Sequence, residues 1–110
     1  MLGLSVWMVY VTCRNEREAL RIGRTCVKEK LAACANILPR IRSFYLWKGK
    51  YYDQRESLLL LKTIPRRYKK LEKRIRQLHT YTVPGIVAYP SKAGFAPYVD
   101  WVMRETRARR

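Results

Sequence analysis

The sequence predicts an α+β fold, a ferredoxin-like βαββαβ antiparallel sheet with helices on one face. Strand-like runs of β-branched and aromatic residues alternate with two segments of helical apolar spacing, in the order strand, helix, strand, strand, helix, strand. The two middle strands flank Lys48-Gly49-Lys50, a turn that joins antiparallel neighbours. This order is that of the split βαβ arrangement. With 110 residues, the chain is long enough for one domain, 1–110.

The first half of the chain predicts a strand followed by a helix. Residues 4–12 form the strand, because β-branched and aromatic side chains dominate them. Asn15, followed three residues later by Glu18, fits the N-terminal cap of a helix. We expect this helix to run to about Leu31, with an apolar stripe at Ala19, Ile22, Cys26 and Val27.

The second half predicts a long hairpin, a helix, a short strand and a final helix. Residues 35–47, interrupted near Pro39, and residues 51–63 form the hairpin, with Gly49 where a positive φ is needed. Pro65 suits the first turn of the second helix, whose apolar positions are Tyr68, Leu71, Ile75 and Leu78. Residues 85–89 predict the last strand and 96–104 a short helix, followed by a frayed basic tail over about 105–110.

Composition limits the compartment and the partners. The chain has 24 basic and 8 acidic residues, a net charge of +16 that attracts polyanions. Its 3 cysteines form no CxxC pair, which argues against a disulfide framework and predicts the reducing cytoplasm. The apolar start lacks the features of a signal peptide, and no apolar run approaches the roughly 20 residues of a membrane-spanning helix. We therefore expect no membrane partner.

The strands are apolar on both faces. If helices cover one face of an antiparallel sheet, its other face is polar when water covers it. Residues 58–61, however, are four consecutive leucines. Burial of each leucine stabilises by roughly 1.5–3 kcal/mol. The sequence therefore predicts that further copies of the chain cover the second face.

Five segments, in order, resemble the CutA divalent-cation-tolerance family over about residues 6–102. They are LAACAN at 31–36, Pro39 with SFYLWKGK at 43–50, Glu56 with Leu59 and Lys62-Thr63, HTYTVPGI at 79–86, and Tyr98 with Trp101. The resemblance implies a PII-like homotrimer with no catalytic activity, associated with divalent cation tolerance and copper binding. The chain departs from the family pattern at Arg40, Thr80, Thr82 and Gly85, and this last position is a glutamate in the family.

His79 and Cys34 are the candidate metal ligands. The resemblance implies a site for copper or another divalent cation near His79, and a Cys34 thiolate would suit copper(I). Since Gly85 has no carboxylate, we expect copper binding to be weak and to depend on His79. Two other interpretations stay open: His79 as a residue that ends a helix, and Cys34 as a small buried residue.

Five aromatic residues are candidates for the trimer interface or an inter-subunit pocket. Amphipathic aromatic side chains often anchor interfaces, and they also line pockets. The five are Tyr45, Trp47, Tyr51, Tyr81 and Trp101.

The second predicted helix carries a basic face that could contact a polyanion. Its candidates are Arg66, Arg67, Lys69, Lys70, Lys73 and Arg74. They support an alternative function as a basic trimeric module that binds nucleic acid or another anion, although such faces are usually only solvated. An enzyme is not predicted, because there is 1 histidine and no GxSxG or Gly-rich phosphate motif.

Overall fold

The computed structural model describes residues 5–107. It contains a four-stranded antiparallel sheet and three helices, which confirms the predicted α+β class. In chain order the elements are β1 (Trp7–Cys13), α1 (Glu16–Lys28), β2 (Cys34–Trp47), β3 (Lys50–Thr63), α2 (Pro65–Leu78), β4 (Ile86–Pro90) and α3 (Ala96–Glu105).

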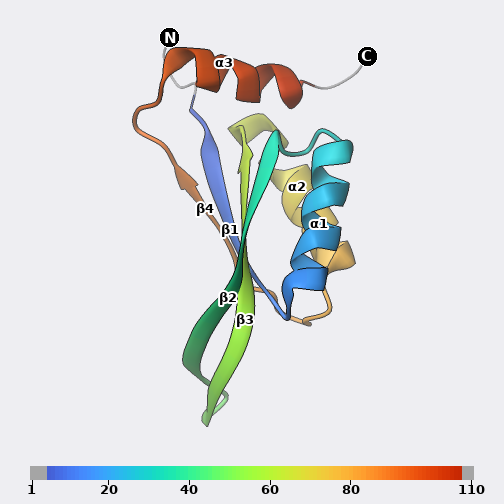
Figure 1. Ribbon diagram of the computed structural model, residues 1–110, viewed down its shortest axis with the longest axis vertical. Helices are drawn as coiled ribbons and strands as arrows, with labels where there is room; N and C mark the ends of the chain where they lie inside the picture. The colour runs from blue at the N-terminus through green and yellow to red at the C-terminus, as the bar shows by residue number, and fades with distance from the viewer. Residues whose placement is uncertain (1–4, 108–110) are drawn as a thin grey trace.

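The helices are not spread evenly around the sheet. The strand order is β2-β3-β1-β4, and every neighbouring pair is antiparallel. Helices α1 and α2 lie side by side against one face, α3 lies across one end, and the β2–β3 hairpin extends beyond the other end (Figure 1). The molecule is accordingly elongated, with principal dimensions of 46 × 27 × 22 Å.

Helix α1 begins as predicted and ends earlier. The Asn15 side chain accepts a hydrogen bond from the Glu18 backbone N–H at 2.9 Å, which confirms the cap. The helix ends at Lys28 rather than near Leu31, because Lys30 adopts a left-handed φ of 62°. The Leu31 N–H then donates back to the Cys26 carbonyl at 2.9 Å, as in a Schellman motif. A lysine gives little sequence signal for this stop, since glycine is the usual residue there.

The hairpin follows the predicted pattern. Lys48 and Gly49 both have positive φ, 52° and 79°, so the turn is of the type that matches the twist of paired strands. The pairing shifts register between Leu38 and Ile41, next to Pro39, whose nitrogen has no hydrogen to donate. Both the positive φ at Gly49 and the interruption near Pro39 are confirmed.

The hydrophobic core lies between the helices and one face of the sheet. Val9, Val11, Leu59 and Leu61 are fully buried there against the helices. Between them in sequence, β1 and β3 present side chains to the opposite face. We call this the open sheet face, defined by Met8, Tyr10, Leu38, Leu58, Leu60, Val87 and Tyr89.

No element of residues 5–107 covers the open sheet face. Tyr10 pairs with Leu60 on one side and with Val87 on the other, so the apolar side chains are contiguous. Val87 is 45% exposed and Tyr89 56% exposed. A single chain therefore leaves water on an apolar surface, as the sequence predicts.

The C-terminal end is packed further than expected. The last helical residue is Glu105, and the buried Thr106 hydroxyl donates to the Val102 carbonyl at 2.8 Å. The rest of the predicted frayed tail, residues 108–110, lies outside the described residues. Among the described helices, none has the length and apolar character needed to cross a membrane.

Candidate functional site

His79 ends α2 and fixes the loop that follows it. Its buried ring places Nε2 2.8 Å from the Thr12 carbonyl oxygen, and Nδ1 accepts the Tyr81 backbone N–H at 3.0 Å. Because a carbonyl only accepts, Nε2 carries the proton, and the ring is the neutral Nε2–H tautomer. Both ring nitrogens are therefore engaged, and the helix-ending role of His79 matches this geometry.

Glu18 ties the start of α1 to the same loop. Its buried carboxylate accepts the Arg14 backbone N–H through Oε1 and the Thr80 backbone N–H through Oε2, each at 2.8 Å. Burial alone raises the pKa of a carboxyl, but the hydrogen bonds from Thr80 and Arg14, with His79 nearby, outweigh it and lower the pKa of Glu18. Sequence reasoning identified the local cap and missed the contact with Thr80, 62 residues away.

Cys13, Glu18 and His79 form the one compact group of potential metal ligands among residues 5–107. Their candidate ligand atoms all lie within 4.8 Å of one another. Yet the histidine nitrogens and carboxylate oxygens already bind partners, and burial, reinforced by nearby Glu18 and Glu56, raises the pKa of the Cys13 thiol to about 12. Metal binding requires deprotonated and available donors. The arrangement therefore does not fit a divalent cation without rearrangement.

The structure separates Cys34 from His79. Cys34 pairs with Lys62, while Thr12, which His79 contacts, pairs with Leu58. Four residues of strand separate these positions, about 13 Å. Cys34 lies instead near α3, with Sγ 3.9 Å from the Tyr98 hydroxyl. The two predicted metal ligands therefore do not share a site within one chain.

Gly85 lies directly beside Thr12. Its carbonyl accepts the Thr12 N–H at 3.3 Å, and a Cβ at this position would meet Thr12 Oγ1 at 3.2 Å. Any longer side chain at position 85 would therefore crowd the Thr12 hydroxyl.

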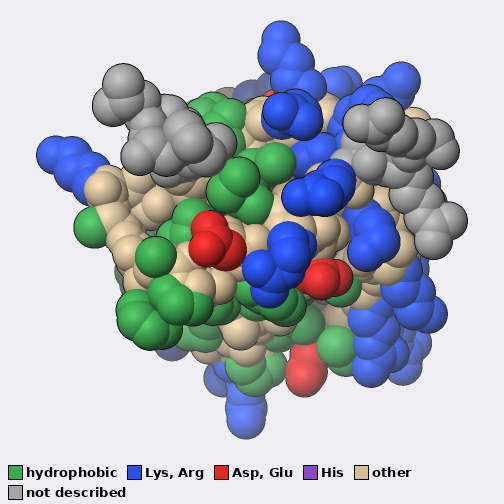
Figure 2. All heavy atoms as spheres, turned by 90° about the horizontal axis from the view of Figure 1, so that it is seen from above, with side chains coloured by type: hydrophobic (Ala, Val, Ile, Leu, Met, Phe, Trp, Pro, Cys, Tyr) green, Lys and Arg blue, Asp and Glu red, His purple; other side chains and the backbone are tan. Residues whose placement is uncertain are grey.

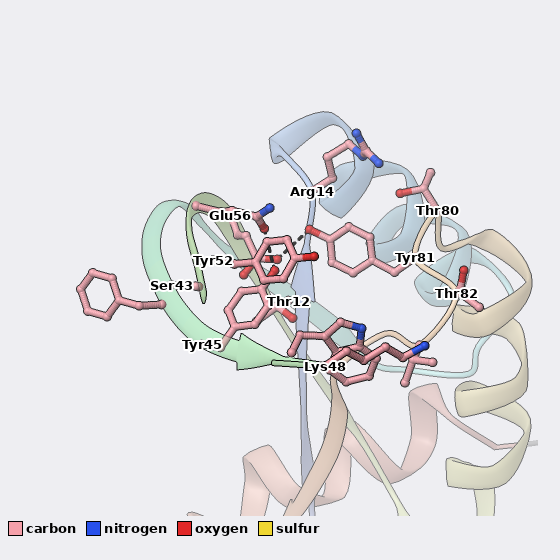
Figure 3. A pocket seen from close by; sticks show the side chains of 15 residues that line it. Thr12, Arg14, Ser43, Tyr45, Lys48, Tyr52, Glu56, Thr80, Tyr81 and Thr82 are labelled. Carbon is pink, nitrogen blue, oxygen red and sulfur yellow. Dashed lines mark hydrogen bonds between the residues drawn. The ribbon is translucent and has the colours of Figure 1, made fainter. Parts of the chain in front are cut away.

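A cleft of about 770 Å³ lies between the hairpin and the loop after His79, and we call it the hairpin cleft (Figure 3). On one wall the Tyr81 hydroxyl donates to Glu56 Oε2 at 2.7 Å. On the other, the rings of Tyr45 and Tyr52 stack 5.2 Å apart. Burial, together with the Glu56 carboxylate, raises the pKa of the Tyr81 hydroxyl, so it stays a proton donor at neutral pH. The residues that line the cleft are Thr12, Arg14, Ser43, Phe44, Tyr45, Trp47, Lys48, Tyr52, Gln54, Glu56, Thr80, Tyr81, Thr82, Val83 and Gly85.

The structure brings together three of the five aromatic candidates. Tyr45, Trp47 and Tyr81 line the hairpin cleft. Tyr51 does not line it and is 81% exposed. Trp101 is a residue of α3, at the other end of the molecule, where it packs against a small second core with its ring 5.6 Å from that of Tyr98.

The six basic candidates of α2 divide by environment. Arg74 binds both Glu29 oxygens, so its charge is paired, and Arg67 is partly buried. The other four, Arg66, Lys69, Lys70 and Lys73, are exposed. Sequence reasoning missed a second row of exposed cations on α1, which the same helical spacing would have revealed.

The carboxylates of β3 do not form an acid and base pair. Asp53 binds Arg42 with its two oxygens at 2.9 and 3.0 Å, while Glu56 accepts from Tyr81. The guanidinium of Arg42 lowers the pKa of Asp53.

Comparisons with known proteins agree on one family. The family described as CutA1 divalent ion tolerance protein matches residues 7–105. The Divalent-cation tolerance protein CutA of Thermus thermophilus is 42% identical over 99 residues, 90% of this chain and 96% of that protein. Protein CutA of Mus musculus is 39% identical over 104 residues, and the chain spans 59% of its length.

Solved structures agree as well. The chain is similar to the divalent cation tolerance protein (Cut A1) from Thermus thermophilus, with a TM-score of 0.90 at 41% identity over 93% of this chain and 99% of that one. It is also similar to CutA1 from Oryza sativa, with a TM-score of 0.91 at 36% identity over 97% and 98% of the two chains.

Proposed function

The chain belongs to the CutA1 divalent ion tolerance family, and we propose that it serves divalent cation tolerance as a cytoplasmic homotrimer without catalytic activity. In this proposal each subunit is ferredoxin-like and the assembly is PII-like. The three free cysteines favour a reducing compartment. Glu56, the one carboxylate that lines the hairpin cleft, already accepts the Tyr81 hydroxyl, which favours binding over acid–base chemistry there.

The open sheet face is the observation that carries the proposal. Its side chains are contiguous, apolar and uncovered in one chain. Burial of apolar surface yields about 25 cal/mol per Å², so an exposed face of this kind favours association. Trp47, exposed near the hairpin turn, pairs with Lys50 on the same side of β3 as Leu58 and Leu60, so it adds apolar surface to this side of the sheet.

Light scattering at micromolar concentration tests the assembly. We expect a particle of three times 13.1 kDa, about 39 kDa. Leu60→Lys, which places a charge at the centre of the open sheet face, is expected to give monomers that keep their circular dichroism. A wild-type protein that stays monomeric or dimeric would contradict the proposal.

Copper binding is expected to be weak. A cation can bind His79 Nδ1 only if it displaces the Tyr81 backbone N–H. It can bind the Cys13 sulfur only if the thiol loses a tightly held proton. Calorimetric titration with copper at pH 7.5 and pH 5.5 should show weak binding that fades at the lower pH, since protons compete for imidazole. His79→Ala should abolish it, and Cys34→Ala should leave it unchanged because Cys34 lies elsewhere. Tight binding that survives His79→Ala would remove His79 as a ligand.

A further inference from the structure

Two rows of cations cover the outer side of the helical layer. On α1 they recur at i, i+4, i+7 and i+11, and on α2 at similar spacing, so each row follows one side of its helix. All nine are exposed, and we call them the cationic helix face: Arg17, Arg21, Arg24 and Lys28 on α1, with Arg66, Lys69, Lys70, Lys73 and Arg76 on α2. In Figure 2 the Lys and Arg side chains are densest on the right, the side of α1 and α2 in Figure 1, and most of the visible hydrophobic side chains lie at the left and in the centre.

These charges are mostly unbalanced. Glu16 is the only exposed acidic residue within α1 and α2. Of the nine cations, only Arg21 forms an ion pair with another residue of 5–107, at 3.8 Å from Glu18. Ion pairs with neighbouring carboxylates therefore do not account for the excess of positive charge on this face. A polyanion would neutralise them and release its own counterions.

The rows are held in a defined arrangement. Arg21 of α1 donates to the Leu78 carbonyl of α2 at 2.7 Å, and Arg74 of α2 binds Glu29 just after α1 at 2.9 Å. These contacts make the two helices antiparallel neighbours. Packed helices lie about 8–10 Å apart, and helices of this length span about 20 Å.

We propose that the cationic helix face binds the phosphate backbone of double-stranded DNA. The typical 8–10 Å between packed helix axes is comparable with the width of a B-form major groove, about 12 Å, so two rows of cations suit phosphates on both sides of that groove, whereas the major groove of an RNA duplex is narrow and deep. Single strands are bound by aromatic stacking, and the face contains no aromatic side chain. A membrane-inserting surface requires exposed apolar residues, and α1 and α2 expose only Pro65.

The binding is expected to be independent of base sequence. The face lies on the opposite side of the sheet from the open sheet face, so assembly through the latter leaves the cations accessible. With about six phosphates neutralised, the logarithm of the association constant should fall with the logarithm of salt concentration at a slope of about −5.

Fluorescence anisotropy with a labelled 20-base-pair DNA duplex, from 50 to 250 mM salt, tests the proposal. The surface variant combines Arg17→Gln, Arg24→Gln and Lys73→Gln, and it spares Arg21 and Arg74, which fix the helices. The matched control combines Lys92→Gln, Arg104→Gln and Arg107→Gln, which removes the same charge from exposed positions outside the face.

The surface variant should bind at least 10-fold more weakly and reduce the slope to about −3, while the control stays within about 2-fold of the wild type. Equal weakening of both variants would overturn the proposal, because net charge alone would then explain binding. The proposal is also overturned if the protein does not bind the DNA duplex at 50 mM salt. It is overturned as well if the protein binds an RNA duplex or a single strand of the same sequence more tightly than the DNA duplex, or if it binds phosphatidylserine vesicles more tightly. Light scattering of each variant shows whether assembly is intact, so failure of DNA binding is distinguishable from failure of the trimer.

Discussion

Glu18→Gln is expected to destabilise the fold by about 2–4 kcal/mol. The Glu18 carboxylate accepts two backbone N–H groups, from Arg14 and Thr80, and a glutamine offers one oxygen in their place. One of these partly buried N–H groups then faces an amide NH₂ and loses its partner. Hydrogen bonds to a charged group contribute roughly 1.5–3 kcal/mol each, and an unpaired buried donor costs about 1–3 kcal/mol.

Urea unfolding at fixed protein concentration measures the loss, since the stability of an assembled protein depends on that concentration. The matched control is Glu16→Gln, an exposed carboxylate in the same first turn, which should cost about 0.5 kcal/mol or less through the helix dipole. Equal stability of Glu18→Gln and Glu16→Gln would show that the link between α1 and the loop after His79 contributes little.

Glu18 also makes the stability of the fold depend on pH in a direction that can be predicted. The pKa of Glu18 is lower in the folded protein than its ordinary value of 4.5. Its stabilisation is therefore fully present above about pH 4.5 and is lost as the pH falls through the folded pKa. Glu18→Gln should lose less stability than the wild type between pH 5 and pH 3. The exposed carboxylates paired with arginine, Glu29 and Asp53, act in the same direction in both proteins.

Trp47→Ala is expected to weaken assembly more than it disturbs one subunit. Trp47 lies at the far end of β2 and is 45% exposed. Aromatic anchors at interfaces commonly contribute 2 kcal/mol or more, a change on the order of 30-fold in association. A dilution series in the analytical ultracentrifuge should therefore shift dissociation to higher concentration, while the far-ultraviolet circular dichroism stays unchanged.

Phe95→Ala provides the aromatic control. Phe95 is 75% exposed and precedes α3, at the opposite end of the molecule from the hairpin turn. It should dissociate like the wild type. If Trp47→Ala stays assembled at the concentrations where the wild type does, Trp47 is not an anchor.

Local chemistry explains why the sequence predicts the elements well. Asn15 marks a helix start because its side chain binds a nearby backbone N–H, and Gly49 marks a turn because it tolerates positive φ. Both signals act over a few residues. The predicted end of α1 is too late because Lys30 adopts a left-handed backbone without being glycine, and no short-range rule predicts that.

The site was predictable only in part, because its contacts are long-range. The bonds of His79 to Thr12 and of Glu18 to Thr80 join residues 67 and 62 positions apart. A single sequence contains no signal for such pairs. Cys34 was paired with His79 and Trp101 with the aromatic residues of the hairpin, but Cys34 lies beside Tyr98 of α3 and Trp101 is part of α3 itself.

The β2–β3 hairpin projects beyond the helices, and this projection couples the folding of the hairpin to association between chains. Residues 43–54 extend past the helices, and most of their side chains are exposed in one chain. An isolated two-stranded hairpin is marginally stable in water. Under the proposed trimer, the helical half of the subunit folds first as a unimolecular step, and the outer hairpin gains its stability when another copy docks. Refolding to the mature protein is then a reaction of higher than first order, whose rate increases with protein concentration.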